Sequence, residues 1–377
     1  MKRLTRTTTY ASAAAVALCL ASGPSFAHEP GDYQSTLAGA TIGNLGGALP
    51  LPGFYVSVEY VNGINGVGAG QNNGITSDGN IVIPALLWST GWKFLGGNIG
   101  VAVIQPHYTN GILQSNCTFT PVATGPPNCI NGVPAGSGKG VGFYENIHNT
   151  VFQAVDSWNW KNGWFTSLGF GFQGPDGSTY NGTLNQDYWT YSPLGGVSYI
   201  DKKWKASVNV DYDIHTASNG HTGSYAFVAY QTALGSGPLP GLPGGIESIG
   251  KGYTSGNSLY VDWSAEHRIR KLSFGPGGDF ILQTTSDSPG AGLNCTILAN
   301  LPVPTGGTFG TNNLGCGKMR KVAVGAVLSY DLGLADIDVF ATRDVYTRDE
   351  FSGTKLVFRV TFKIVHGEQK KEANISD

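Results

Sequence analysis

The sequence predicts an all-β fold: a single antiparallel transmembrane β-barrel of about twelve strands, with short periplasmic turns and long extracellular loops. Three observations support this prediction. Strands alternate apolar and polar residues, connections alternate short and long, and tryptophans gather near the short turns. The composition agrees, since 56 of the 377 residues are Gly and only 13% are charged. Such a composition is typical of β structure with generous loops.

The first residues, 1–27, are predicted to form a secretory signal peptide. Three basic residues lie within the first six positions, a short apolar run covers 11–21, and Ser25-Phe26-Ala27 fits a small-x-small cleavage site. A spanning helix needs roughly 18 apolar residues, so this run is too short for one. The mature chain is therefore expected to begin at His28.

Three parts are expected in the mature chain. Residues 28–52 lack clear periodicity and either lie in the periplasm or plug the barrel. The barrel is expected at 53–365, and residues 366–377 are expected to form a periplasmic tail. The sequence shows no other long apolar stretch. A secreted chain of this kind spans a membrane only if its sheet closes on itself, because closure satisfies every backbone group.

Two segments alternate between apolar and polar side chains almost without fault. Successive residues of a strand point to opposite faces, so each segment has one oily and one polar face. In residues 355–364 the oily face comprises Leu356, Phe358, Val360, Phe362 and Ile364, and the other comprises Lys355, Val357, Arg359, Thr361 and Lys363. In residues 204–215 the oily face comprises Trp204, Ala206, Val208, Val210, Tyr212 and Ile214, and the other comprises Lys205, Ser207, Asn209, Asp211, Asp213 and His215. Such strands fit a wall between lipid and a wet lumen.

Alternating or β-rich segments recur between turn signals along the whole chain. They lie near 54–61, 80–89, 97–108, 146–159, 163–173, 188–200, 203–215, 257–268, 271–283, 320–331, 335–345 and 354–364. Short turns are expected near 91–96, 161–163, 201–203, 269–270 and 332–334, and longer connections at 62–79, 109–145, 174–187, 216–256, 284–319 and 346–353. This alternation is typical of outer-membrane barrels, whereas a soluble sandwich has no reason to keep it.

Six of the eight tryptophans lie within a few residues of an expected short turn. They are Trp88, Trp92, Trp158, Trp160, Trp164 and Trp204. Tryptophan is favoured at the headgroup level of a membrane, where its ring is apolar and its N–H meets water. These residues are interpreted as an aromatic girdle at the periplasmic rim. The alternative is that they fill cores between packed sheets.

The polar members of each alternating strand are the candidate lumen residues. They are Glu59, Gln153, Ser167, Lys205, Asn209, Asp211, Asp213, Asp262, Glu266, Asp338, Thr342, Lys355, Arg359 and Lys363. The last strand brings cations, and the strand before it brings Asp338 and Asp344, which are expected near Arg359 and Lys355. Paired charges of this kind stiffen the wall and shape a permeation path. The alternative is that a wet interior tolerates charge and these residues have no individual role.

Four cysteines remain in the mature chain. Each pair lies within one Gly/Pro/Asn-rich stretch, and export permits disulfides, so Cys117–Cys129 and Cys295–Cys316 are the natural pairs. Zinc binding is the alternative. The spacing does not match the usual zinc patterns and no histidine flanks the cysteines.

Several function classes are disfavoured by the sequence. Without the three basic residues of the signal, 20 basic residues face 25 acidic ones, a net charge of −5, which argues against nucleic-acid binding. No metal-ligand spacing or cofactor motif is apparent, and no G-x-S-x-G is present, so no enzyme is expected. Two alternatives stay open: an outer-membrane lipid hydrolase, which needs a Ser and a His together near the rim, and a soluble secreted β-sandwich or lectin.

Five local motifs, in order along residues 48–364, carry a resemblance to a known family. They are A-L-P-L-P-G-F-Y at 48–55, N-Q-D-Y-W-T-Y-S-P at 185–193, Y-T-S-G-N at 253–257, Q-T-T-S-D-S-P-G at 283–290 and the closing K-L-V-F-R-V-T-F-K-I. The chain resembles outer-membrane transporters of the meta-pathway of phenol degradation. The resemblance implies a monomeric twelve-stranded barrel that passes small hydrophobic or bulky organic molecules and often accompanies aromatic catabolism. The chain departs from the family in its long insertions at 109–140 and 216–250, and in a tail beyond Ile364.

The sequence thus favours a passive outer-membrane channel of a Gram-negative bacterium, in contact with the lipid bilayer and with small organic solutes. An alternative from another class is a structural or adhesive barrel that binds a surface partner through disulfide-stapled loops.

Overall fold

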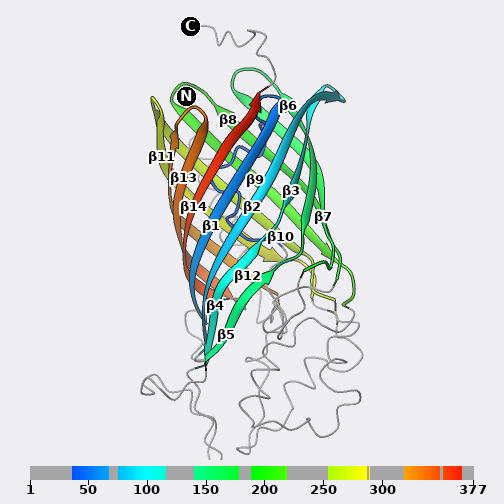
Figure 1. The fold of residues 1–377 in the computed structure, drawn as a ribbon, viewed down its shortest axis with the longest axis vertical. Coiled ribbons are helices and arrows are strands. Elements are labelled where there is room, and N and C mark those ends of the chain that lie inside the picture. Colours follow the sequence, from blue (N-terminus) through cyan, green and yellow to red (C-terminus); the bar gives the residue numbers. More distant parts are fainter. Residues whose placement is uncertain are drawn as a thin grey trace, which may run out of the picture.

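The computed structural model describes residues 36–67, 75–115, 140–177, 188–218, 254–286, 288, 318–348 and 351–366. Their strands form one antiparallel sheet that closes into a barrel, with every strand tilted against the barrel axis (Figure 1). The predicted signal peptide at 1–27, residues 367–377 of the predicted tail and the cysteines Cys117, Cys129, Cys295 and Cys316 lie outside the described residues. Over the described ranges, no helix is long and apolar enough to cross a membrane.

Fourteen strand segments make up the sheet. They are β1 (Gly53–Val67), β2 (Ile75–Phe94), β3 (Gly97–Ile104), β4 (His107–Ser115), β5 (Gly140–Ile147), β6 (Val151–Asn159), β7 (Trp164–Gln173), β8 (Thr190–Ile200), β9 (Trp204–His215), β10 (Ser258–Ile269), β11 (Leu272–Gln283), β12 (Arg320–Asp331), β13 (Ala335–Arg348) and β14 (Phe351–His366). Each segment pairs with its neighbours, and β1 closes the ring by pairing with both β14 and β2.

Two of the barrel's strands are each divided into two segments. β3 and β4 are separated only by Gln105 and Pro106, and β2 pairs with both of them. β5 and β6 are separated by residues 148–150 and pair with β4 and β3 respectively. Proline has no N–H to donate to a ladder, so a break at Pro106 is expected. Fourteen segments less these two breaks give twelve strands around the barrel, and the predicted fold is confirmed.

The predicted strands are present, but the predicted connections at 62–79 and 109–145 are too long, because β4 continues to Ser115 and β5 begins at Gly140. β1 and β2 extend well past the predicted 54–61 and 80–89. The predicted longer connection at 346–353 is wrong, because β13 continues to Arg348 and β14 begins at Phe351. The Gly353 N–H donates to the Asp344 carboxylate (2.7 Å), which ties these strand ends together. The turn predicted at 91–96 is also narrower, since β2 continues to Phe94.

Tight turns at one end of the barrel hold several residues in the left-handed region of the backbone. Leu95 and Gly96 connect β2 to β3 with φ of 45° and 85°, the pattern of a two-residue hairpin turn. The next turn holds Lys161, Asn162 and Gly163 at φ of 67°, 51° and 82°. Asn and Gly adopt this region more readily than other residues, so local chemistry and hairpin closure agree there.

The barrel wall is apolar outside and mostly polar inside. On β14, Leu356 and Phe358 are 49% and 45% exposed, whereas Val357 and Arg359 between them are buried. β7 repeats the pattern, with Leu168 at 66% exposed beside the buried Ser167. A water-soluble protein rarely exposes a continuous apolar surface of this size. The medium around this face is therefore hydrocarbon, as the alternation predicts.

Candidate functional site

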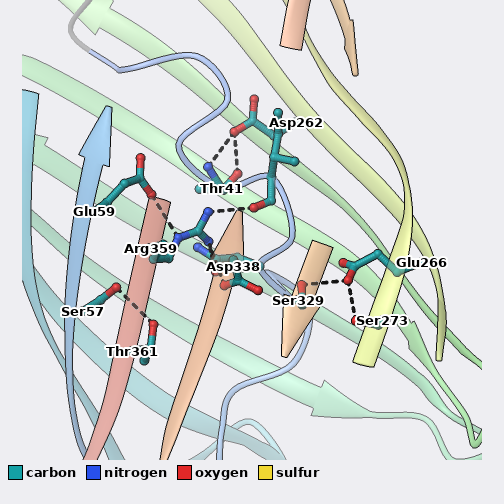
Figure 2. Close-up of polar contacts among 12 residues, drawn as sticks. Thr41, Ser57, Glu59, Asp262, Glu266, Ser273, Ser329, Asp338, Arg359 and Thr361 are labelled. Carbon is teal, nitrogen blue, oxygen red and sulfur yellow. Dashed lines mark hydrogen bonds and ion pairs between the residues drawn. The ribbon is translucent and has the colours of Figure 1, made fainter. Parts of the chain in front are cut away.

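A row of charged and hydroxyl side chains crosses the inner wall in register. Arg359 on β14 lies opposite Glu59 on β1 and Asp338 on β13. Its guanidinium contacts the Glu59 carboxylate at 3.0 Å and the Asp338 carboxylate at 3.9 Å, and all three side chains are buried. Figure 2 shows this group, with Ser329 continuing the row on β12. Because these charges are buried, removal of one partner would leave the other unpaired and would destabilise the folded barrel.

Residues 36–52, which precede β1, run along this inner wall and hydrogen-bond to it. Asp262 on β10 makes the densest set of contacts. Its carboxylate accepts the N–H of Gly39 (2.8 Å), the N–H of Thr41 (2.8 Å) and the Thr41 hydroxyl (2.7 Å). The segment passes between Asp262 and Arg359 in Figure 2. Three bonds to one ionised carboxylate hold this part of the segment firmly, since bonds to charged groups are the stronger ones.

Two basic residues of β14 hold the same segment from the opposite wall. Arg359 donates to the Ile42 carbonyl (2.7 Å) and to the Asn44 side chain. Lys355 donates to the Ala38 carbonyl and lies 3.6 Å from the Asp279 carboxylate. The charged side chains of β14 therefore serve both the wall and the segment inside it.

Hydroxyl and amide groups of β6 to β9 contact the glycines of the segment. Ser198 accepts the Gly47 N–H at 2.9 Å, and the Ser157 hydroxyl donates to the Gly47 carbonyl at 2.7 Å. Ser167 donates to the Gly46 carbonyl at 2.7 Å. A side chain at Gly47 would meet the Ser198 backbone at 2.6 Å, so only glycine allows this close approach.

An apolar row crosses the other part of the inner wall. Val61, Val357, Phe340 and Val327 are directly paired neighbours on β1, β14, β13 and β12, and Ile81 on β2 extends the row. These residues are buried and form one cluster with Ile83 and with Ile42 of the segment, and Leu37 packs against it. The segment is thus held by hydrogen bonds from both sides of the wall, and the apolar row adds an extended hydrophobic contact around Ile42 on one of them.

Other predicted lumen residues also lie on the inner face. Lys205 and Glu266 approach to 3.3 Å, and Asn209 donates to the carbonyl groups of Thr41 and Asn44. Asp213 accepts bonds from Ser192 (2.5 Å) and Thr36 (3.2 Å). The remaining predicted positions are placed as follows: Asp211 beside Asp213 on β9, Thr342 buried on β13, Gln153 half-buried on β6, and Lys363 at the turn end with Asp336 at 3.3 Å.

The predicted pairing of Asp338 with Arg359 is present, but Asp344 has a different partner. It forms an ion pair with Lys321 at 2.9 Å. Sequence reasoning did not single out Lys321, Asp279, Ser198 or the segment's backbone groups. Lys321 and Asp279 lie on the inward side of predicted strands, so their alternation was a usable signal. The contacts of Gly46 and Gly47 are made by backbone atoms, which leave no residue-type signal.

The six predicted girdle tryptophans all lie on the outer side of the wall near the tight turns. Trp92, Trp160, Trp164 and Trp204 are exposed, and Trp88 and Trp158 are half-buried. Trp88 stacks on Phe54 with ring centroids 5.4 Å apart. The Trp158 and Trp160 indole N–H groups donate to the Leu95 carbonyl (3.1 Å) and the Thr166 hydroxyl (2.7 Å). These environments match the apolar body and polar tip of an interfacial tryptophan.

A second aromatic group lies farther along the outer wall, toward the opposite end of β7 and β8. The ring centroid of Trp189 lies 6.3 Å from that of Phe172 and 6.4 Å from that of Tyr191. Phe170 joins the same group through Tyr191, at 6.3 Å. The sequence predicted only the first group, because the second lies away from the short turns. Two aromatic bands fit the two interfaces of a bilayer.

At the tight-turn end, Asp201 has a distinct electrostatic setting. Its carboxylate accepts the backbone N–H groups of Lys203 and Trp204 (both 2.6 Å) and the Tyr199 hydroxyl (2.8 Å). These bonds to the charged form, led by that of Lys203, lower the pKa of Asp201. Among the described residues, no three His, Cys, Asp or Glu side chains are grouped so as to hold a metal ion.

Comparison with known proteins agrees with this geometry. The family model described as "Putative MetA-pathway of phenol degradation" matches residues 61–360. An outer membrane channel from Pseudomonas putida F1 aligns over 84% of this chain and 97% of its own, with 10% identity and a TM-score of 0.54. The β domain of the Bordetella autotransporter BrkA aligns over 83% and 100%, with 11% identity and a TM-score of 0.40. No curated protein matches the sequence. The fold, with its apolar outer face, is that of a Gram-negative outer-membrane barrel.

Proposed function

Because the chain belongs to the family described as the putative MetA-pathway of phenol degradation, we propose that it is a channel for passive uptake of small hydrophobic or aromatic organic molecules. The family description supports a link to aromatic catabolism. The closed barrel with its apolar exterior supports a location in the outer membrane. The inner wall supplies the path for the solute.

The single observation that carries the solute class is the apolar row on the inner wall. A channel for polar solutes has a polar lumen, and the serines of β6 to β10 would serve one. Val61, Val357, Phe340 and Val327 instead give a continuous hydrocarbon surface on five neighbouring strands with Ile81. Hydrocarbon gains free energy on leaving water for such a surface. A hydrophobic solute that reaches the lumen therefore has a favourable place to bind.

Residues 36–52 act as the constriction of this channel in the proposed mechanism. The segment contacts β2, β6 to β10 and β14, for example through the Ser89 hydroxyl bond to the Pro50 carbonyl at 2.9 Å. A segment bound on both walls limits the free cross-section of the lumen. Passage then depends on movement of the segment away from one of the two walls.

A flux measurement tests the proposal. The purified chain is inserted into asymmetric vesicles with lipopolysaccharide in the outer leaflet, which slows spontaneous entry of hydrophobic molecules. The proposal predicts faster uptake of 4-methylphenol than in protein-free vesicles, with a much smaller increase for glucose. Equal uptake of 4-methylphenol with and without the protein would refute transport.

A further inference from the structure

Ile42 is the one isoleucine of the described segment 36–52, and its side chain is fully buried on the inner wall. It belongs to the cluster of Val61, Ile81, Val327, Phe340 and Val357. A methyl group added at Gly277 would lie 3.1 Å from one Ile42 methyl. The Ile42 side chain is therefore closely packed against the inner wall.

The wall beneath Ile42 is built from five different strands. Val61 pairs with Ile81 on one side and Val357 on the other, and Phe340 pairs with both Val357 and Val327. An inward apolar surface costs free energy when water covers it. The side chain of Ile42 removes that cost. Any hydrocarbon of similar size is able to replace it.

A hydrogen-bond donor lies at the edge of this surface. Arg359 donates to the Ile42 carbonyl at 2.7 Å, and its guanidinium carbon lies 5.3 Å from the centre of the Phe340 ring. Ile42 thus presents an apolar side chain next to a neutral oxygen acceptor. Glu59 and Asp338 already surround the guanidinium with negative charge. A solute carboxylate would meet this charge and be repelled, whereas a hydroxyl or carbonyl oxygen would not.

We infer that Ile42 occupies a solute-binding site on β1, β2 and β12 to β14, and that this site takes neutral molecules with a compact hydrocarbon or aromatic body and one oxygen acceptor. Solute binding and retention of Ile42 in the site exclude one another. Binding therefore draws residues 36–52 away from this wall. The inference rests on the proposed function, since it names the solute class of that channel and its site.

Methyl NMR on the full chain in nanodiscs tests the inference. Isoleucine δ1-methyl groups are labelled, and 4-methylphenol, toluene and 4-methylbenzoate are titrated in turn. Ile42 reports on the site, and Ile364, 58% exposed on the outer face, reports on solute dissolved in lipid. We expect a saturable shift of the Ile42 signal, with 4-methylphenol binding about tenfold more tightly than the other two. An Ile42 signal that does not move, or that follows Ile364 in proportion to added solute, overturns the inference.

Variants sharpen this test. Ile42→Ala removes the occupant and leaves the wall intact, so 4-methylphenol should bind about tenfold more tightly, as reported by the methyl groups of Ile81 and Ile83. Ile42→Val, the matched control, should change the affinity by less than about threefold. Val357→Phe fills the site and should abolish the saturable shift. Unchanged affinity of Ile42→Ala for 4-methylphenol contradicts the inference. Retained binding in a correctly assembled Val357→Phe barrel also contradicts it. If the Val357→Phe barrel does not assemble, the wild-type titration decides.

The vesicle flux measurement separates this inference from the proposed function. Flux of 4-methylphenol without a saturable Ile42 shift refutes the site and leaves the channel. A saturable Ile42 shift without any flux supports the site and refutes the channel.

Discussion

The two sides of the inner wall hold the same segment with different proportions of hydrogen bonding and hydrophobic contact. On β6 to β10, hydroxyl, amide and carboxylate groups such as Ser198 and Asp262 bind backbone N–H and carbonyl groups of residues 36–52. On β12 to β14, β1 and β2, an apolar row contacts the side chain of Ile42, and Arg359 and Lys355 add hydrogen bonds to backbone carbonyl groups. Hydrogen bonds are directional and fix one position of the segment. Hydrophobic contact is non-directional, so the side with the extended apolar row is the one where we expect a foreign hydrocarbon to replace Ile42.

This difference suggests that the two sides of the wall have different roles. The polar side anchors the segment, and the apolar side offers a surface on which the segment and a solute compete. Arg359 lies at the boundary, because it contacts Glu59 of the wall, the Phe340 ring and the Ile42 carbonyl. Changes to each side should therefore have different consequences.

Removal of the segment from both sides should have the largest effect. A chain that lacks residues 36–50 loses the contacts to Asp262, Ser198 and the apolar row together. Single-channel conductance in planar bilayers should rise severalfold, because the segment no longer narrows the lumen. The control is heat-modifiable mobility on a gel, which shows that the barrel has assembled. An assembled barrel of unchanged conductance would contradict the assignment of 36–52 as the constriction.

Loss of the boundary residue should chiefly affect stability. Arg359→Gln leaves Glu59 buried without its ion-pair partner, which costs about 3–5 kcal/mol for a buried pair. The double variant Glu59→Gln with Arg359→Gln removes both charges and should recover a substantial part of that loss. Urea unfolding in lipid vesicles measures both. Equal destabilisation in the single and double variants would show that the charge pair is not the cause.

Weakening of the polar side should free the segment without unfolding the barrel. Asp262→Ala removes three hydrogen bonds from Gly39 and Thr41, and net values of about 1.5–3 kcal/mol apply to bonds with a charged group. The open fraction of single-channel records should rise at least tenfold. Ser198→Ala removes one neutral bond to Gly47 and one to Ser207 of the wall, and it should raise the open fraction by only about fivefold, because only the first bond holds the segment. Asp336→Asn at the tight-turn end is the control and should not alter gating. An effect of Ser198→Ala as large as that of Asp262→Ala would contradict this ranking.

The smallest effect is expected outside the lumen, at Asp201. Its pKa is lowered in the folded state by bonds from Lys203, Tyr199 and Trp204. A lowered pKa means that the turn contributes its stability above the unfolded-state pKa and loses it as the pH falls through the folded-state value. The stability difference between wild type and Asp201→Asn should therefore shrink below about pH 4. Urea unfolding at pH 7 and pH 3 measures it. A difference independent of pH would exclude the carboxylate's charge as the cause.

The alternation of residues 355–364 was enough to predict which side chains face lipid and which face the lumen. Register then placed Asp338 beside Arg359, because the two strands are joined by a hairpin. The position of residues 36–52 was left open between the periplasm and the barrel. That segment lacks periodicity, and glycines such as Gly46 and Gly47 bind through backbone atoms. The contact of Ile42 was not predictable, because only the closed barrel brings Val61, Phe340 and Val327 together.

A reversible covalent lock tests the role of the segment most directly. The Cβ of a residue at 46 would lie 3.4 Å from the Cβ of Asn209, close to the separation in disulfides. Gly46→Cys with Asn209→Cys is introduced after Cys117, Cys129, Cys295 and Cys316 are replaced by Ser. Single-channel conductance is then recorded before and after reduction. Low conductance in the oxidised barrel that rises severalfold on reduction is the result we expect. Conductance unaffected by reduction, with the disulfide shown to form, would contradict the claim that residues 36–52 control passage through the lumen.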